Sequence, residues 1–210
     1  LTDATCPLVT LVHNVAKKLL QNNYEVVIFG KHDHPESIGT KSHIKGDDTF
    51  IVESPEEYFK LITYIKNNNL TKVAIISQTT MSVQGYKQLI TNLNNEINFQ
   101  EIPLSLKNLE INFGFVDTIC QPTKQRQSDT DDVAKNSDII IVIGGINSSN
   151  TKELLTTCKK LGKEAYMIQS KDQLNKNWFT NKNKVGITAG ASTPDITIKE
   201  VADWIQNLNI

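Results

Sequence analysis

An internal repeat is the feature that most constrains the fold of this chain. Cys6, within Asp-Ala-Thr-Cys-Pro, recurs 114 residues later as Cys120, within Asp-Thr-Ile-Cys-Gln-Pro. Recurrence of the same pattern in the same order predicts two related units that share one architecture. The other matched pairs are Asp3 with Asp117, Tyr24–Gly30 with Asp138–Gly144, His34 with Ser148, Glu36 with Asn150 and, at an offset of 113, Val73–Ser77 with Gly186–Gly190.

Short apolar runs alternate with amphipathic helical patterns along both repeats. The runs are rich in β-branched residues, which is typical of parallel strands buried on both faces of a sheet. We therefore expect an α/β fold of repeated small parallel-sheet domains, at residues 1–105 and 110–196, followed by a C-terminal helix at 197–210. The expected strands are Val26–Phe29, Val73–Ile76, Ile139–Ile143 and Val185–Thr188.

The charge and hydropathy of the chain limit the classes of partner. The 22 basic and 23 acidic residues give a formal net charge of −1. The chain therefore lacks the positive excess typical of proteins that bind nucleic acid or anionic membranes. Its longest apolar run, Ile139–Ile143, is far shorter than the ~20 residues that span a bilayer. We expect neither nucleic acid nor membrane as a partner.

Polar residues follow the end of each expected strand, where ligands of parallel α/β sheets bind. Hydroxyl groups and helix N-termini can hold a phosphate or diphosphate there without Lys or Arg. Any one cluster is equally well explained by helix capping, with Ser149, Asn150 and Ser192 as caps. Four clusters at equivalent ends favour an anion site. The clusters are His34–Glu36, Ser77–Thr80, Asn147–Asn150 and Ala189–Ser192.

Cys6 and Cys120 each precede a helix that begins near a proline. A helix N-terminus stabilises the thiolate, the form of cysteine that binds metal or attacks an electrophile. The alternative is an inert buried cysteine, but the matched positions favour a functional role. Two thiolates alone complete neither a zinc site nor an iron–sulfur cluster, which needs three or four cysteines.

The remaining cysteine and three of the histidines lack such a context. Cys158 falls within a helical pattern, and we expect it to be a small helix residue and not a metal ligand. His13, His32 and His43 are expected to face solvent. His34, in contrast, shares an exposed turn with Glu36, which favours a functional role for both.

Six spaced motifs in this order resemble the LytB family of 4-hydroxy-3-methylbut-2-enyl diphosphate reductases. The resemblance spans almost the whole chain and implies three α/β domains with pseudo-threefold symmetry around a central cluster, of which two repeats are present here. The matching stretches are Asp3–Val9, His34–Glu36, Ser77–Val83, Asp117–Gln127, Asn147–Thr151 and Thr188–Asp195.

The resemblance also implies a chemistry and a set of site residues. It implies a [4Fe–4S] cluster that is held by three cysteines and leaves one iron open, and the removal of the substrate hydroxyl as water by two electrons and protons. Cys6 and Cys120 would be cluster ligands, Glu36 the proton donor, and Thr79 would order the substrate hydroxyl. The diphosphate would be held by His34, Ser148, Ser149, Asn150 and Ser192. A Glu36 carboxyl near a diphosphate and an electron-rich cluster should have a raised pKa.

The chain departs from the family pattern in several respects. Two substrate-binding histidines of the family's first domain have no match here, and Gln121-Pro122 after Cys120 and Asp33 before His34 are less usual. No motif supplies the third cluster cysteine, and the chain begins at Leu1 within a motif, so we expect the sequence to be part of a longer one. The resemblance implies ferredoxin or flavodoxin as electron donor. The Asn- and Lys-rich composition and the form of Asn147–Thr151 indicate a plastid-type organelle, with bacterial cytoplasm as the alternative.

Two alternatives of other classes stay open on the residues alone. The Ser, Thr and Asn clusters would also suit a non-catalytic two-domain module that binds a phosphorylated metabolite. A cysteine-dependent transferase acting through Cys6 or Cys120 is a weaker alternative, because no His–Asp partner is evident near either in the sequence.

Overall fold

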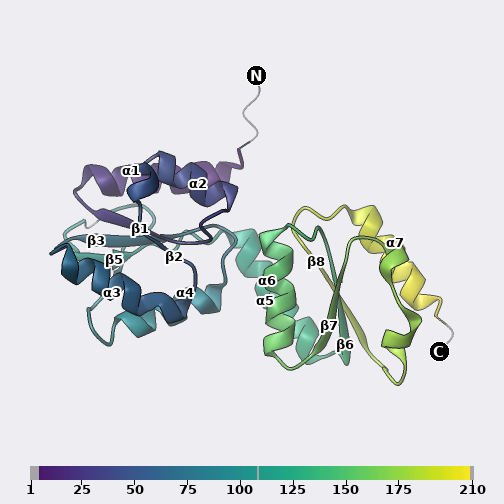
Figure 1. Cartoon of the computed structure of the whole chain (residues 1–210). Helices are drawn as coiled ribbons and strands as arrows, with labels where there is room; N and C mark the ends of the chain where they lie inside the picture. Colours follow the sequence, from purple (N-terminus) through teal and green to yellow (C-terminus); the bar gives the residue numbers. More distant parts are fainter. Residues whose placement is uncertain (1–4, 108, 209–210) are drawn as a thin grey trace. The chain divides into compact units, whose positions relative to one another are not determined.

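The computed structural model describes residues 5–107 and 109–208 (Figure 1). The chain divides into two compact units, Leu1–Cys120 (unit 1) and Gln121–Ile210 (unit 2). This division differs from the expected start of the second domain at residue 110. Strand β5 (Phe113–Phe115) pairs with a strand of the first sheet, so this stretch belongs to unit 1.

Unit 1 contains a parallel five-stranded sheet in the order β2-β1-β3-β5-β4. Its central pair is β1 (Glu25–Phe29) and β3 (Val73–Ser77), which are in register from Glu25 opposite Val73 to Phe29 opposite Ser77. Every residue of both strands is buried, as the apolar runs predicted. The outer strands are β2 (Ile51–Val52), β4 (Gln100–Glu101) and β5.

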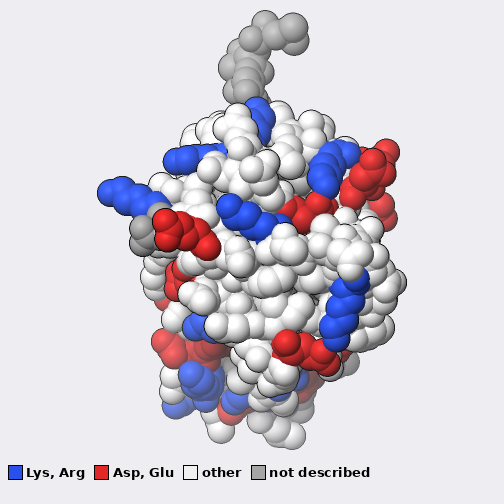
Figure 2. All heavy atoms as spheres, turned by 90° about the vertical axis from the view of Figure 1, so that its left-hand side faces the viewer, with Lys and Arg blue, Asp and Glu red and all other residues white. Residues whose placement is uncertain are grey.

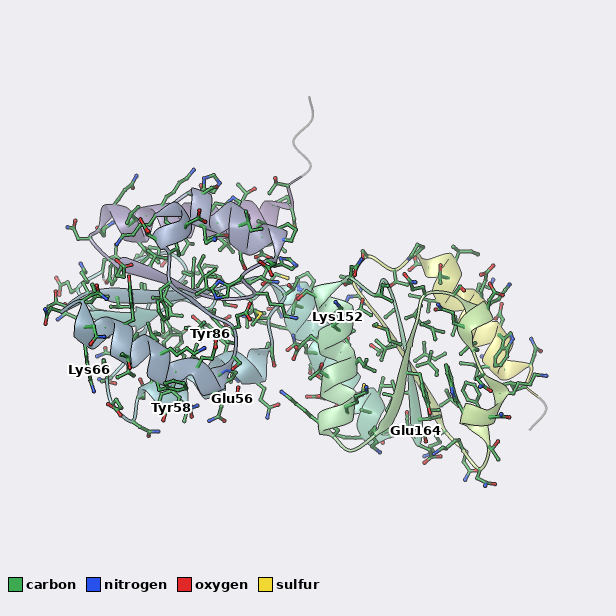
Figure 3. The ribbon with its side chains drawn as sticks, viewed as in Figure 1. Glu56, Tyr58, Lys66, Tyr86, Lys152 and Glu164 are labelled. Carbon is green, nitrogen blue, oxygen red and sulfur yellow. The ribbon has the colours of Figure 1, made fainter. Side chains whose placement is uncertain are left out.

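Helices cover both faces of this sheet (Figure 1). One face packs against α1 (Pro7–Gln21), and α2 (Pro35–Ser42) lies on the same side. The other face packs against α3 (Tyr58–Asn67) and α4 (Val83–Leu93). Tyr86 of α4 points into this core, where its hydroxyl donates a hydrogen bond to the carbonyl oxygen of Ile75 at 2.9 Å (Figure 3). Short 3-10 turns complete the unit at Gly46–Asp48 and Pro55–Glu57.

Unit 2 repeats this arrangement on a smaller scale. Its parallel sheet has the order β7-β6-β8, with β6 (Ile139–Ile143) in the centre, β7 (Glu164–Ile168) on one side and β8 (Val185–Ala189) on the other. One face packs against α5 (Gln121–Lys135) and α6 (Ser149–Lys160). The other packs against α7 (Asp195–Gln206) and the 3-10 turns Lys171–Gln173 and Lys176–Phe179.

The repeat that the sequence predicts is present in the backbone. Helices α1 and α5 begin 114 residues apart, and so do strands β1 and β6. The residue after β3, Gln78, donates its N–H to Phe29 O at 2.9 Å. Gly190, after β8, donates in the same way to Ile143 O at 2.8 Å. The loops after these strands are therefore structural equivalents at an offset of 112 residues. The predicted match of Val73–Ser77 with Gly186–Gly190, at an offset of 113, is wrong by one residue, because the strand equivalent to β3 is Val185–Ala189.

The surface carries both signs of charge. On the face of unit 1 shown in Figure 2, Lys and Arg side chains are interspersed with Asp and Glu side chains among uncharged residues. Within the described residues no helix has the length and apolar character needed to traverse a bilayer.

Candidate functional site

Apart from Cys6, the predicted site residues lie at two equivalent places in the fold. In each unit the chain leaves a central strand, crosses to one neighbour and returns to the strand on the other side. Ligands of open α/β sheets bind at the carboxyl ends of the strands where this reversal occurs. In unit 1 this switch point lies between β1 and β3, and in unit 2 it lies between β6 and β8.

Glu36 is the central residue of the unit 1 switch point. It lies in the first turn of α2, is only 8% exposed, and is held by both donors of Thr79. Its Oε1 accepts the N–H of Thr79 at 2.6 Å, and its Oε2 accepts the Thr79 hydroxyl at 2.8 Å. These bonds join the loop after β1 to the loop after β3.

The pKa of Glu36 is raised above its ordinary value, chiefly because burial penalises the charged carboxylate. The two bonds from Thr79 oppose this shift because they stabilise the ionised form. The direction of this pKa shift agrees with the expectation from the sequence, but its cause in this structure is burial and not a neighbouring anion. A carboxyl group in this position retains its proton to higher pH than an exposed one.

His34 is the N-cap of α2 and is half-buried. Its Nδ1 accepts the N–H of Glu36 at 3.2 Å, which in a neutral imidazole leaves the proton on Nε2. Burial and the nearby Lys31 lower the pKa of His34, so this neutral form is favoured. The ring therefore offers one N–H donor beside the Glu36 carboxyl.

The loop that carries Cys120 is tied to the same cluster. The carbonyl oxygen of Thr79 accepts the N–H of Cys120 at 3.1 Å. Thr118, two residues before Cys120, exchanges two hydrogen bonds with the backbone of Ser77 through its hydroxyl, at 2.7 and 2.6 Å. Sequence reasoning did not single out Thr118, whose part depends on the pairing of β5 with β3.

Gln78 is a second supporting residue that sequence reasoning noted only as part of a cluster. Its Oε1 accepts the N–H of Lys31 at 3.1 Å and lies 3.4 Å from the hydroxyl of Ser37, both in the segment after β1. Gln78 is 2% exposed. It therefore stabilises the segment that carries His34 and Glu36.

The described part of the chain contains all three cysteines, and none is in a disulfide. Cys6 is exposed at the N-cap of α1, and Cys120 is half-buried just before α5. Cys158 lies in the core of unit 2, where burial raises its pKa to about 11, which agrees with its expected role as a small helix residue.

The two helix-terminal thiols suit a soft metal or an iron–sulfur cluster as donors. The described residues contain no group of three or more His, Cys, Asp or Glu that could hold a metal ion by itself. A cluster held by these two thiols would take its remaining ligand from outside the described residues. Asp3, matched to Asp117 in the repeat, lies outside the described residues.

Asn150 dominates the unit 2 switch point. It occupies the first turn of α6, is 5% exposed, and neither its amide oxygen nor its amide nitrogen has a hydrogen-bond partner among the described residues. The repeat explains why. Asn150 is the equivalent of Glu36, but the equivalent of Thr79 is Ala191, which has no hydroxyl to offer. A buried amide without partners costs stability, and a bound ligand would supply them.

The residues around Asn150 expose further donors. Ser148 is the N-cap of α6, and its Oγ accepts the N–H of Thr151 at 3.2 Å. Ser149 is half-buried and Ser192 is exposed in the turn after β8. The sequence allowed Ser149, Asn150 and Ser192 as caps. In the structure Ser148 caps α6 and Pro194 stands at the N-cap of α7.

Two glycines allow α6 to approach the strand ends closely. A Cβ on Gly190 would come closer than 3.0 Å to the hydroxyl oxygen of Thr151, and one on Gly144 would lie 2.5 Å from the same atom. Thr151 is fully buried. The first turn of α6 is therefore packed directly against the β8 turn, which brings Asn150 and Ser192 to the same end of unit 2.

One expectation about the histidines is wrong. His13 and His43 do not face solvent as separate side chains, because their ring centroids lie 4.3 Å apart and both residues are half-buried. The Nε2 of His13 is buried without a partner in the described residues. Burial, His43 and Lys17 lower the pKa of His13. This contact could not be predicted from the sequence, because α1 and the end of α2 meet only in the folded unit.

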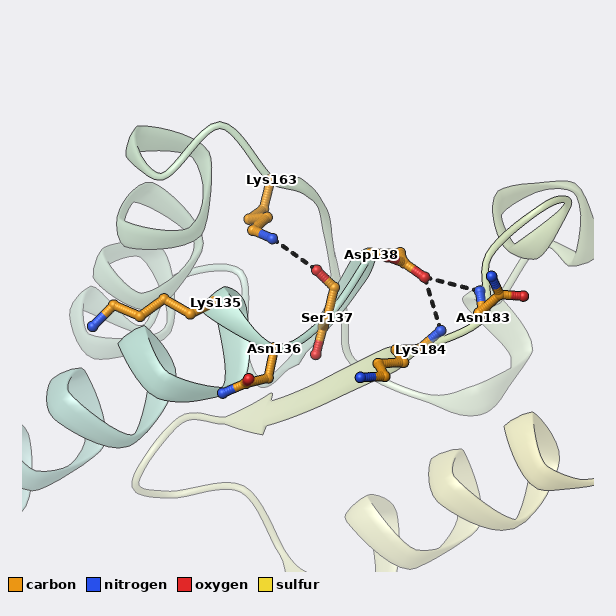
Figure 4. Close-up of a pocket in the computed structure, with 7 residues that line it drawn as sticks. All are labelled: Lys135, Asn136, Ser137, Asp138, Lys163, Asn183 and Lys184. Atoms are coloured by element: carbon orange, nitrogen blue, oxygen red, sulfur yellow. Dashed lines mark hydrogen bonds between the residues drawn. The ribbon is translucent and has the colours of Figure 1, made fainter.

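A cavity of about 310 Å³ in unit 2 is not part of this site (Figure 4). It lies at the amino ends of the strands and is lined in part by three lysines. Its carboxylate is already bound, since Asp138 Oδ2 accepts the N–H groups of Asn183 and Lys184 at 2.9 Å each. Lys163 donates to the carbonyl oxygen of Ser137 at 2.9 Å. These polar groups connect the starts of the strands.

Parallel α/β units with polar groups gathered at their switch points define a class of proteins that bind small ligands at the strand ends. A family model described as "LytB protein" matches residues 1–206. The chain belongs to the LytB family.

The similar proteins carry one functional name. The chain is 39% identical over 206 residues to the 4-hydroxy-3-methylbut-2-enyl diphosphate reductase of Campylobacter concisus and 35% identical over 206 residues to that of Helicobacter hepaticus. Each alignment covers 98% of this chain and 68% of the relative. The chain thus spans about two thirds of the length of these curated relatives.

A solved structure shares the fold. The reductase from Plasmodium falciparum superposes with a TM-score of 0.84 at 27% identity, over 99% of this chain and 60% of that one. A second, titled as the terminal enzyme of the non-mevalonate pathway, gives a TM-score of 0.53 at 33% identity and covers 98% of this chain and 67% of its own. The predicted α/β class and the resemblance to this family of reductases are confirmed.

Proposed function

We propose that this chain forms the proton-donating and diphosphate-binding parts of an iron–sulfur reductase. Its substrate would be 4-hydroxy-3-methylbut-2-enyl diphosphate, and its products would be isopentenyl and dimethylallyl diphosphate. The observation that carries the proposal is the buried Glu36 carboxyl, held by Thr79, whose carbonyl oxygen in turn accepts the N–H of Cys120. Removing a hydroxyl group as water requires such a proton source beside the reacting centre.

Glu36 would supply a proton to the departing hydroxyl. Its raised pKa keeps the carboxyl protonated at a higher pH than an exposed glutamate. The Thr79 hydroxyl, 2.8 Å from Oε2, can accept a hydrogen bond from the protonated carboxyl and donate its own to the substrate oxygen. Thr79 would thereby order the hydroxyl that leaves.

Cys6 and Cys120 would hold the cluster together with a third thiolate from outside the described residues. When bound, a [4Fe–4S] cluster with one open iron supplies the electrons and a binding position for the substrate oxygen. The chain's own contribution is to present two thiols at the starts of helices α1 and α5. Ferredoxin or flavodoxin would deliver the electrons.

The diphosphate would bind to neutral donors. The buried amide of Asn150 has both atoms available, and Ser148, Ser149 and Ser192 add hydroxyl groups at the same end of unit 2. The positive end of the α6 helix dipole favours an anion there. His34, with its Nε2 proton, would be a further donor to the diphosphate.

A metabolite-binding module without catalysis is the second candidate. The unpartnered amide of Asn150 favours it, because anion binding there requires neither thiol. This reading predicts diphosphate binding to colourless, iron-free protein. Diphosphate binding that requires the cluster excludes it.

The curated relatives are bacterial, from Campylobacter and Helicobacter. We therefore place the enzyme in a bacterial cytoplasm, the alternative that the sequence left open, in preference to a plastid-type organelle. Fractionation of the source cells would test this placement.

The deciding experiment replaces Glu36 in the anaerobically reconstituted full-length protein that carries this sequence. Glu36→Gln keeps the size and removes the exchangeable acid, so turnover with a chemical reductant should fall ~100-fold or more, as expected for loss of a general acid. Glu110→Gln, which changes an exposed carboxylate, is the matched control. Unchanged turnover in Glu36→Gln would show that Glu36 is not the proton donor.

A further inference from the structure

Arg126 is the only arginine among the 22 basic residues of the chain. It lies in α5, and its Nη1 donates a hydrogen bond to the carbonyl oxygen of Ala189 at 3.0 Å. Ala189 is the last residue of β8, three positions before Ser192. The guanidinium group is therefore hydrogen-bonded to the end of β8, where the turn that contains Ser192 begins.

The repeat shows that this contact is not required by the fold. The equivalent of Arg126 in α1 is Val12, which is 2% exposed and packs in the apolar core of unit 1. The strand-end carbonyl equivalent to that of Ala189 belongs to Ser77, and it accepts the hydroxyl of Thr118 at 2.6 Å. Unit 1 thus satisfies this carbonyl with a neutral group, whereas unit 2 uses a permanent charge.

Helix α5 is attached to β8 by polar contacts. Its buried residues are Thr123, Gln127, Thr130 and Ala134, whereas α1 buries Val12, Val15, Ala16 and Leu19. The hydroxyl of Thr130, one turn after Arg126, lies 2.8 Å from that of Thr188. Polar contacts of this kind stabilise less than apolar packing but fix one geometry. These contacts lie at the carboxyl end of β8, which is also the end where the proposed site lies.

Arg126 also adds a positive charge to the end of β8. The donors proposed for the diphosphate in unit 2 are all neutral, while a diphosphate carries several negative charges. Within the described residues Arg126 forms no ion pair with a carboxylate. A guanidinium has five N–H donors, and one carbonyl oxygen occupies only one of them.

We propose that Arg126 is a positioning residue that sets the affinity for diphosphate. It holds the end of β8 and brings to the unit 2 switch point the positive charge that distinguishes a diphosphate from a less charged phosphate ester. This inference rests on the proposed function, because it assumes that the anion binds between α6 and the β8 turn.

The test compares two substitutions by calorimetric titration of the chain with inorganic diphosphate and with inorganic phosphate. Arg126→Gln keeps an N–H donor that can reach a carbonyl oxygen but removes the charge. Arg126→Lys keeps the charge. Diphosphate affinity should fall roughly tenfold or more in Arg126→Gln and stay within about threefold in Arg126→Lys, the scale of one charge-assisted interaction. Phosphate affinity should fall less than diphosphate affinity.

The salt dependence separates a role for the charge from a merely structural one. In Arg126→Gln the affinity for diphosphate should depend less steeply on salt concentration than in the unmodified protein, because one charge no longer contributes. Equal losses for both anions with an unchanged salt dependence would overturn the proposal, as would unchanged binding. If Arg126→Gln does not fold, weak diphosphate binding by a folded Arg126→Lys overturns it. Failure of the unmodified chain to bind diphosphate would refute the proposed anion site itself.

Discussion

The contact between Gly190 and Thr151 makes a sharp prediction about unit 2. In Gly190→Ala the new Cβ would come closer than 3.0 Å to the Thr151 hydroxyl, a separation that real Cβ atoms do not show. Gly190 has no positive φ, so the cost of alanine comes from this contact and not from backbone strain. Thr151 is fully buried and β-branched, which leaves its hydroxyl little freedom to rotate away. The first turn of α6 must therefore shift.

The expected loss of stability is that of overpacking a core, about 1–3 kcal/mol. For a unit of this size, 1 kcal/mol lowers the melting temperature by about 4–8 °C, so thermal unfolding followed by circular dichroism will detect it. Thr151→Ala removes the obstructing oxygen together with a hydroxyl that has no partner among the described residues. The double variant should therefore recover most of the loss, which is a coupling of ~1–2 kcal/mol in a double-mutant cycle.

Gly145 provides the matched control. A Cβ there would meet nothing within 4 Å, and its φ is not positive, so Gly145→Ala should be neutral or slightly stabilising. If Gly190→Ala melts at the same temperature as the unmodified protein, α6 is not packed against the β8 turn as described. If Thr151→Ala does not relieve the loss, the obstructing atom has been wrongly identified.

Three further predictions follow from the site residues. Burial raises the pKa of Glu36 above the unfolded value of 4.5. The contribution of Glu36 to the free energy of unfolding is therefore present below pH 4.5 and is lost as the pH rises through the folded pKa. Denaturant titrations should show this loss in the unmodified protein and not in Glu36→Gln. Asn150→Leu should raise stability by about 1 kcal/mol, since it removes an unpartnered buried amide, and should abolish diphosphate binding; a less stable variant that still binds would contradict the account. Iodoacetamide should label Cys6 rapidly and leave Cys158 unlabelled in the native state, and mass spectrometry showing the reverse order would be inconsistent with their burial.

The parts of the fold that the sequence predicted are those encoded by local pattern. Continuous β-branched runs gave strands β1, β3, β6 and β8 to within one residue at each end, because strands buried on both faces need apolar residues at every position. The offset of 114 residues also located the matching starts of helices α1 and α5.

The parts that the sequence did not predict depend on which segments meet in space. The unit boundary falls after Cys120 because β5 pairs with β3, a choice that a three-residue strand does not signal by itself. The pairing of His13 with His43 joins α1 to the end of α2 across 30 positions. The unpartnered state of Asn150 becomes visible only when Ala191 is seen to occupy the place of Thr79.

The candidate site shows the same division. Its residue types and order pointed to His34, Glu36, Thr79 and the polar cluster of α6. The structure adds how Thr79 holds Glu36 through two donors and how its carbonyl oxygen binds the loop of Cys120. Arg126 falls within the matching stretch Asp117–Gln127, but its contact with Ala189 joins residues 63 positions apart and is visible only in the fold.

The most direct test of the central claim is the iron and acid-labile sulfide content of the full-length protein that carries this sequence, after anaerobic reconstitution. The account predicts about four of each per chain, with strong loss in Cys6→Ser and Cys120→Ser and no loss in Cys158→Ser. Iron-free protein that nevertheless binds diphosphate would contradict the reductase and leave the metabolite-binding module as the function of this fold.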